Sequence, residues 1–202
     1  MIDIDRFDIS KSLVCAVLDN VSKKLSHDLG LHVAIILQDS VDDEILERME
    51  QLEQEIFSIE DNVYSRNDIL ECLAEEDSLL LLLKINNNIE GYAFGYNEDE
   101  DDPTVRGTDY FIDSALVSLQ YEHKGIGEII SGVMFMMLYL LGYRSIGILT
   151  EEKDKTGREL VKFYQRLGFE LVDNTEEYGC AMRKQLNKEF YRQVCSRLGV
   201  AD

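Results

Sequence analysis

The chain of 202 residues contains one proline and no tryptophan, and it has only four cysteines and three histidines. No two cysteines form a Cys-x-x-Cys unit, so the sequence predicts neither a metal site nor a disulfide framework, and we expect reduced thiols in a cytoplasmic protein. Lysine and arginine total 20 against 40 acidic residues, which gives a net charge of −20. Without an excess of basic residues to displace counterions, we expect no nucleic-acid partner. The acidic balance is compatible with a cationic partner, although it also serves solubility alone.

The N-terminus also lacks the basic start of a signal peptide. One long apolar run, 125–142, contains Glu128 near its start and is followed at once by Tyr143 and Arg144. Because these polar residues and the next apolar run are typical of a helix buried against a sheet, we expect no membrane partner. Hydrophobic residues make up 45% of the chain, enough for a folded core despite 30% charged residues.

Apolar spacing and turn residues predict one α/β domain over residues 1–202, because no linker or repeat divides the chain. Six helices are expected, at 9–29, from about 40 to 57, and at 66–75, 125–141, 156–167 and 187–198. The second is opened by a capping box of Ser40 and Asp43, the third is capped by Ser65, and the fifth is opened by a capping box of Thr156 and Glu159. The expected strands are 31–37, 79–85, 89–96, 110–119, 144–150, 169–173 and 179–184. The acidic run 98–102 reads as a solvated loop. We interpret 1–30 and 187–202 as helical extensions that cover sheet edges or form a homodimer contact.

The connection Glu122–Gly127, between a strand and a helix, carries the clearest chemical signal. Gly125 and Gly127 let a ligand approach the backbone without obstruction by a Cβ atom. The first N–H groups of a helix have no intrahelical partners and carry positive potential, so an anion such as a pyrophosphate is the natural occupant. Lys124 adds a positive charge there. The alternative is that both glycines only permit close packing of the helix on the sheet.

A second segment, Phe163–Phe169, reads FYQRLGF and places Tyr164 one turn before Gly168, which is expected to end the helix. Taken alone, Tyr164 is typical of a core residue that closes a helix onto a sheet.

These segments together resemble the GNAT superfamily of acyl-CoA-dependent N-acetyltransferases. The resemblance spans about 79–186 and is carried by Gly91–Gly95, by Ala115–Val117 leading to Lys124–Gly127, by FYQRLGF and by Cys180–Lys184. Residues 41–75 resemble more faintly the first two helices of that fold, in the manner of peptide N-terminal acetyltransferases. The resemblance implies a single GNAT-like domain with a mixed, mostly antiparallel central sheet flanked by helices.

Such a resemblance implies transfer of an acetyl group from acetyl-CoA to a primary amine of a small molecule, peptide or protein, by direct attack on the thioester. It implies that the strand segment Leu116–Leu119 binds the pantetheine, with main-chain groups of Val117 and Leu119, and that one N–H polarises the thioester carbonyl. The pyrophosphate is then expected on Glu122, His123, Lys124, Gly125, Ile126 and Gly127.

Tyr164 matches the general acid that protonates the leaving CoA thiolate. Three carboxylates are candidates for the general base that deprotonates the amine: Glu151, Glu152 and Asp113. Alternation along a strand allows only one of the adjacent pair to face the cleft. The acceptor is expected to enter near residues 58–64, where Glu60 and Asp61 would attract a cation.

Two residues depart from the family pattern. Glu122 stands where Q/R-x-x-G-x-G/A begins with glutamine or arginine, and a carboxylate there opposes pyrophosphate binding unless it turns outward. Gly157 stands where the family often has asparagine. These departures support an alternative, a catalytically weak acyl-CoA-binding or regulatory protein that keeps the fold. A third reading is a structural partner protein whose helical extensions dominate its function.

Overall fold

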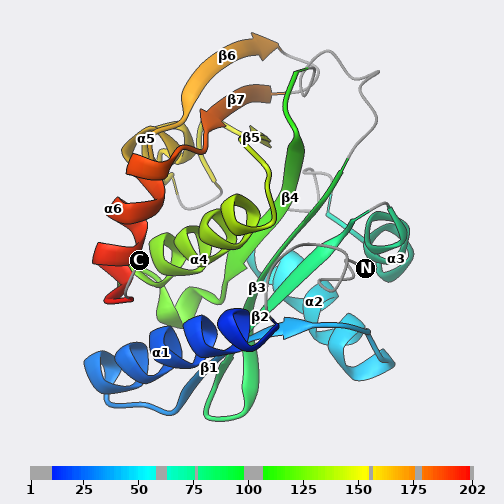
Figure 1. Cartoon of the computed structure of the whole chain (residues 1–202). Helices are drawn as coiled ribbons and strands as arrows, with labels where there is room; N and C mark the ends of the chain where they lie inside the picture. The colour runs from blue at the N-terminus through cyan, green and yellow to red at the C-terminus, as the bar shows by residue number, and fades with distance from the viewer. Residues whose placement is uncertain are drawn as a thin grey trace.

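The structure, a computed structural model, describes residues 11–57, 63–75, 77–97, 107–154, 157–175 and 179–200. Its strands are β1 (Val33–Gln38), β2 (Leu79–Ile85), β3 (Asn88–Tyr96), β4 (Tyr110–Val117), β5 (Ser145–Thr150), β6 (Glu170–Thr175) and β7 (Gly179–Gln185). They form one seven-stranded sheet in the order β1-β2-β3-β4-β5-β7-β6 (Figure 1). Only β4 and β5 pair in parallel among the described strands. The predicted α/β class with a mixed, mostly antiparallel sheet is confirmed.

Helices cover both faces of this sheet. They are α1 (Lys11–Leu29), α2 (Asp43–Ile56), α3 (Arg66–Ala74), α4 (Ile126–Leu140), α5 (Leu160–Arg166) and α6 (Lys188–Leu198), with a short 3₁₀ turn, η2 (Leu119–Tyr121), before α4. The core residues of α1, α4 and α6 form one cluster with one face of the sheet, and those of α2 and α3 form a second cluster with the other face. Figure 1 shows α1 and α4 in front of the sheet and α2 behind it.

The continuous apolar run of β2 follows from its position inside the sheet. Leu79, Leu81 and Leu83 point into the cluster of α1, α4 and α6. Leu80 and Leu82 point into the cluster of α2 and α3. A strand covered on both faces has no need of polar alternation, which is why this segment reads as leucine at five successive positions.

The predicted order of helices and strands is confirmed, but several boundaries were wrong by two residues or more; for example, β1 begins at Val33 instead of 31 and β6 ends at Thr175 instead of 173. Helix α2 has Asp42, not Ser40, as its N-cap, because the Asp42 carboxylate accepts the Ile45 N–H at 2.9 Å. Strand β4 ends at Val117 instead of 119, because the Ser118 N–H turns to the Glu90 carbonyl at 2.8 Å and a 3₁₀ turn follows.

Helix α5 begins at Leu160 instead of 156. Lys153 and Glu159 form an isolated β-bridge before it, and Asp154 and Arg158 hydrogen-bond through their backbones. Residues 9–10, Glu60, Asp61, the run 98–102 and Thr156 lie outside the described residues.

The N-terminal extension covers the edge strand β1. Ser22 and Ser26, one helical turn apart on α1, accept hydrogen bonds from the Ile35 and Val33 N–H groups at 2.8 and 2.9 Å. Two hydroxyls therefore take the place of a neighbouring strand, which satisfies backbone donors that an open edge would expose. This agrees with the sequence interpretation that the extension covers a sheet edge.

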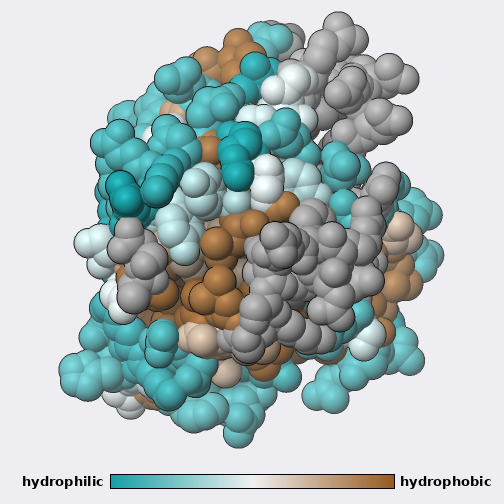
Figure 2. All heavy atoms as spheres, in the orientation of Figure 1, coloured by the Kyte–Doolittle hydropathy of each residue, from teal (hydrophilic) through white to brown (hydrophobic). Residues whose placement is uncertain are grey.

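The C-terminal extension packs on α4. Phe190 of α6 lies 6.1 Å from Phe135 between ring centroids, and Tyr191 stacks on Tyr139 at 4.9 Å. Helix α4 is thus buried between the sheet and a second helix, which explains the apolar run that resembled a membrane span. Figure 2 shows that hydrophobic residues gather between α1 and α4 on this face, while hydrophilic residues cover most of the remaining surface of the described residues.

Candidate active site

A cavity of about 380 Å³ lies where β4 ends and α4 begins. Five segments line it: the end of β4, η2 with the loop after it, the start of α4, α5 with the residues just before it, and Ile56 at the end of α2. The predicted site residues that line it are Leu116, Val117, Glu122, His123, Gly125, Ile126, Gly127 and Tyr164. Those outside its described lining are Asp113, Leu119, Lys124, Glu151 and Glu152. One cavity therefore joins most of the residues expected to bind a cofactor with the expected general acid.

The cavity exists because β4 and β5 diverge. These strands pair only at Tyr110 with Ile146 and at Phe111 with Gly147. Beyond that point the register between β3 and β4 shifts, since Phe94 pairs with Ser114 while Gly95 pairs with Ile112. The residue skipped on β4 is Asp113, so a β-bulge bends the strand there. The end of β4 thereby leaves its parallel neighbour and forms one wall of the cavity.

The start of α4 presents backbone N–H groups to the cavity. Gly125 occupies the N-cap position with φ +74° and offers no side-chain cap. His123 is also left-handed, with φ +60°. Because Gly125, Ile126, Gly127 and Glu128 all line the cavity, uncapped N–H donors of the first turn lie in its wall, where an anion could accept from them.

The glycines are not explained by close packing. A Cβ atom added at Gly125 would meet nothing within 4 Å, although its left-handed φ disfavours other residues. A Cβ atom at Gly127 would lie 3.8 Å from Phe163 Cζ, an ordinary contact distance. Neither glycine is needed for helix packing: the left-handed φ accounts for Gly125, and an open path to the backbone is the better explanation of Gly127.

Glu122 faces the cavity instead of turning outward. Its side chain is 12% exposed, and its Oε1 lies 3.2 Å from Arg158 Nη1. Arg158 lines the same cavity and follows Gly157, the position at which the family pattern is broken. The negative charge of Glu122 is therefore paired with the positive charge of Arg158, a residue that the sequence did not point to.

Two predicted residues make other contacts. The Lys124 ammonium lies over the Tyr121 ring, 4.9 Å from its centroid. The Leu119 N–H, expected to contact pantetheine, donates instead to Glu55 Oε1 at 2.7 Å, and the Ser118 hydroxyl donates to the same oxygen at 2.9 Å. The main-chain role of Leu119 stays a prediction, and Glu55 would have to release the N–H for it.

Tyr164 lies on the α5 wall of the cavity. Its ring packs edge-on against Phe163 and Phe169, with centroids 5.1 and 5.5 Å away. Burial raises the pKa of Tyr164 to about 12, while the positive charge of Arg158 opposes that rise. The phenol is therefore protonated at neutral pH and available as a hydrogen-bond donor.

Asp113, the bulge residue of β4, is held beneath α3. It accepts hydrogen bonds from Tyr64 Oη at 2.7 Å and Tyr96 Oη at 3.0 Å. Burial raises the pKa of Asp113, and hydrogen bonds from Tyr64, Cys72 and Tyr96 counteract it. Tyr64 ends the 58–64 segment where the acceptor is expected, so Asp113 lies on that side of the sheet.

Glu151 and Glu152 differ from Asp113 in their surroundings. They follow the last residue of β5 and are exposed. Exposed carboxylates at a strand end fit the interpretation of solvated charges better than that of a base in a protected site.

Sequence interpretation also missed Glu53, a carboxylate of α2 that is only 1% exposed. It accepts hydrogen bonds from the Tyr92 and Ser114 hydroxyls, and burial raises its pKa. The signal was present, because Glu53 lies between Met49, Leu52 and Ile56 on the apolar face of α2.

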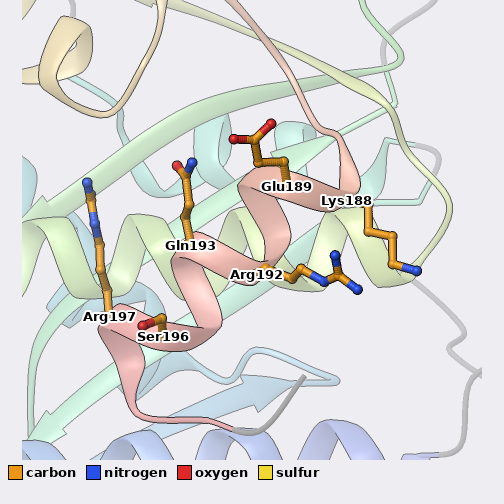
Figure 3. A pocket seen from close by; sticks show the side chains of 6 residues that line it. All are labelled: Lys188, Glu189, Arg192, Gln193, Ser196 and Arg197. Atoms are coloured by element: carbon orange, nitrogen blue, oxygen red, sulfur yellow. The ribbon is translucent and has the colours of Figure 1, made fainter.

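A second hollow lies along α6 and shares no residue with the first cavity. Figure 3 shows the side chains that line it, Lys188, Glu189, Arg192, Gln193, Ser196 and Arg197. None of them was predicted as a site residue. Within the described chain, no cluster of three or more His, Cys, Asp or Glu residues could hold a metal ion. Among the described helices, none combines the length and apolar character needed to cross a membrane.

The profile of the Acetyltransferase (GNAT) family matches residues 46–169, more than half of the chain. The chain belongs to this family. No curated protein sequence matches the chain significantly. The chain is similar in fold to PH1933 from Pyrococcus horikoshii OT3, with 18% identity, a TM-score of 0.63, and coverage of 77% of this chain and 99% of the other.

Two further structures share this fold. The ribosomal-protein-S18-alanine N-acetyltransferase from Escherichia coli has 15% identity and a TM-score of 0.58, with coverage of 77% and 94% of the two chains. PaiA N-acetyltransferase from Thermoplasma acidophilum, in complex with coenzyme A, has 16% identity and a TM-score of 0.56, with coverage of 75% and 99%. At such identities these likenesses show the fold alone.

Proposed function

We propose that the protein is an N-acetyltransferase that moves the acetyl group of acetyl-CoA onto a primary amine. The observation that carries this proposal is the single cavity joining the end of β4, the uncapped start of α4 and Tyr164. A pyrophosphate fits the N–H groups at the helix start, and an extended pantetheine fits the diverging wall of β4. The CoA complex of the Thermoplasma acidophilum relative supports the same ligand.

In the proposed reaction the amine nitrogen attacks the thioester carbonyl carbon, and the C–S bond breaks. Backbone N–H groups of β4 stabilise the oxyanion of the tetrahedral intermediate. The Tyr164 hydroxyl gives its proton to the departing thiolate. Asp113 takes the proton that the amine loses, and both groups then exchange protons with solvent.

Asp113 is preferred over Glu151 and Glu152 as this base for two reasons. It lies at the bulge where β4 leaves β5, next to the expected acceptor side. Burial raises the pKa of Asp113 toward neutrality, and a carboxylate with a raised pKa is the stronger base.

The second candidate is a catalytically weak acyl-CoA-binding protein, favoured by one observation. Glu122 places a carboxylate inside the cavity, where it opposes an incoming phosphate unless Arg158 offsets it. The two candidates differ in turnover and not in ligand.

Thermal-shift titration with acetyl-CoA and with desulfo-CoA tests the ligand first. An absence of stabilisation at millimolar acetyl-CoA would count against both candidates. Release of CoA thiol is then measured across a panel of small amines and peptides. Turnover favours the enzyme, and binding without turnover favours the second candidate.

The role of Tyr164 is tested by Tyr164→Phe, which keeps the ring contacts with Phe163 and Phe169. We expect kcat to fall by about 10²-fold or more, the usual contribution of a general acid, with little change in KM for acetyl-CoA. Full turnover by this variant would show that another group protonates the thiolate.

A further inference from the structure

The ion pair between Glu122 and Arg158 lies in the wall of the cavity and joins two segments that are distant in sequence. It links the loop before α4 to the segment before α5, and both side chains line the cavity. Glu122 Oε1 and Arg158 Nε are buried, and neither makes a hydrogen bond of good geometry within the described part of the chain. Buried charged groups that lack hydrogen bonds are costly. Each of these atoms still lies near an opposite charge, Glu122 Oε1 at 3.2 Å from Arg158 Nη1 and Arg158 Nε at 2.9 Å from Asp154 Oδ2, so the charges are paired but their hydrogen bonding leaves room for a better-placed acceptor.

Arg158 is fixed in place by Asp154. The Arg158 N–H donates to Asp154 Oδ1 at 2.9 Å, and the Asp154 N–H donates to the Arg158 carbonyl at 3.1 Å. Arg158 Nε also lies 2.9 Å from Asp154 Oδ2. Gly157 has φ +84°, a left-handed conformation that permits the tight turn leading into Arg158. The guanidinium is thus positioned before any ligand binds.

The donors of Arg158 suit an anion only once the Glu122 carboxylate is displaced, because one guanidinium facing two carboxylates leaves the unliganded cluster with a net negative charge. One guanidinium lies between the carboxylates of Asp154 and Glu122, and it retains donors on its other nitrogen atoms. Phosphate oxygens bind a guanidinium through charge-assisted hydrogen bonds. The uncapped N–H groups of α4 lie in the same cavity and add positive potential.

We infer that Arg158 binds the phosphates of the cofactor and that Glu122 holds its guanidinium at the cavity until a phosphate replaces the carboxylate. This inference rests on the proposed function. Arg158 would then do what the glutamine or arginine of the family pattern is expected to do at the position occupied here by Glu122. Glu122 is then a positioning residue that competes with the ligand.

Tyr164 couples this binding site to the chemistry. The charge of Arg158 opposes the rise that burial imposes on the pKa of Tyr164. A phosphate bound to the guanidinium weakens that opposition. The residue that binds the cofactor therefore also affects the acid that serves the leaving group.

Calorimetric titration of four ligands tests the inference: CoA, 3′-dephospho-CoA, 4′-phosphopantetheine and pantetheine, which lacks phosphate. We expect Arg158→Gln to weaken CoA and 3′-dephospho-CoA by about tenfold or more, the effect of losing a hydrogen bond between charged groups. Pantetheine should change by less than about twofold. Glu122→Gln should tighten CoA by roughly threefold to tenfold, because a competing charge is removed.

Two further variants serve as controls. Lys162→Gln removes a positive charge from α5 outside the cavity and should leave every affinity unchanged, since Lys162 pairs with the exposed Glu159. Arg158→Lys keeps the charge and should retain most of the CoA affinity and its salt dependence, whereas Arg158→Gln should reduce the salt slope.

The outcomes distinguish a direct contact between Arg158 and phosphate from a role in which Arg158 only stabilises the local structure. Equal weakening of pantetheine and CoA by Arg158→Gln would mean that the residue only fastens α5, and the inference would be wrong. An unchanged CoA affinity would contradict it directly. If CoA is weakened and 3′-dephospho-CoA is not, Arg158 contacts the 3′-phosphate instead of the pyrophosphate. A wild-type protein that binds none of the phosphate-bearing ligands would overturn both the inference and the proposed function.

Discussion

Asp113 shows how a single residue acquires its chemistry from its place in the fold. Successive side chains of an ordinary strand point to opposite faces of the sheet. Here the bulge puts the side chains of Asp113 and Ser114 on the same face, toward α2 and α3. Burial on that side raises the pKa of Asp113. The bulge at which β4 leaves β5 is therefore also the position of a candidate base, two residues before the part of β4 that lines the cavity.

Asp113→Asn tests this base. If Asp113 must be deprotonated to accept the proton of the amine, activity is lost as pH falls through its raised pKa. We therefore expect the acid limb of kcat/KM to lie above the ordinary range of aspartate in the wild type. The substitution should lower kcat by about 10²-fold or more. The matched controls Glu151→Gln and Glu152→Gln should stay within about twofold, and a larger loss in either would transfer the role to that residue.

Glu53 provides a stability test at the residue scale. Burial raises the pKa of Glu53, so the folded state binds its proton more tightly than the unfolded state does. Its contribution to the free energy of unfolding therefore falls as pH rises from the unfolded pKa through the folded pKa. Glu53→Gln removes this penalty while keeping an oxygen for Tyr92 and Ser114.

We expect Glu53→Gln to raise the Tm at pH 8 by a few degrees relative to the wild type, and the difference to vanish below about pH 4, where both states are protonated. Thermal unfolding followed by circular dichroism across pH measures this. A difference that does not depend on pH would point to packing instead of ionisation.

The sequence was sufficient to select several residues that line one cavity, but not the partners that these residues contact. Gly125, Gly127 and Tyr164 could be chosen because a glycine-rich helix start and a tyrosine before a helix end are local patterns. The pairing of Glu122 with Arg158 joins residues that are 36 positions apart, and no local pattern encodes it. The contact of Leu119 with Glu55 could not be predicted for the same reason.

At the scale of helices and strands, the order was predictable and several ends were not. Apolar periodicity identifies α2 and α4 because each is a long helix with many side chains buried in the core. The ends of β4 and α5 depend on hydrogen bonds to other segments, such as Ser118 to Glu90 and Asp154 to Arg158. Short elements bounded by tertiary contacts therefore escape sequence reasoning more than long ones do.

The hydroxyls of α1 give a prediction at this scale. Ser22 is 9% exposed and its Oγ accepts the Ile35 N–H, while donating to the Leu18 carbonyl at 2.6 Å. Ser22→Ala leaves a buried edge-strand N–H without its partner. We expect a loss of about 1–3 kcal/mol in the free energy of unfolding, measured by urea denaturation.

Ser26→Ala is the matched comparison, since Ser26 bonds Val33 in the same way but is only partly buried. Water can replace its hydroxyl, so the loss should be smaller. Equal losses for the two variants would show that burial does not set the cost of the unpaired N–H, and no loss for Ser22→Ala would contradict the role of α1 as an edge cover.

Charge is distributed unevenly over the whole molecule. Residues 39–77, which include α2, α3 and the expected acceptor side, contain 15 acidic and two basic residues. Residues 142–202, which include Arg158 and α5 at the cofactor cavity, contain 11 basic and ten acidic residues. An anionic cofactor and a cationic acceptor would thus each meet the segment of more favourable charge.

This asymmetry predicts the salt dependence of the acceptor. Screening shortens the range of attraction between exposed charges, so kcat/KM for a cationic acceptor should fall by roughly threefold to tenfold as ionic strength rises from low to about 0.5 M. The measurement uses saturating acetyl-CoA and two peptides with the same N-terminal amine, one carrying arginines and the other glutamines at those positions. Only the arginine peptide should lose efficiency. An equal loss for both peptides would place the effect on the cofactor or the chemistry, and the acidic side would then serve solubility alone.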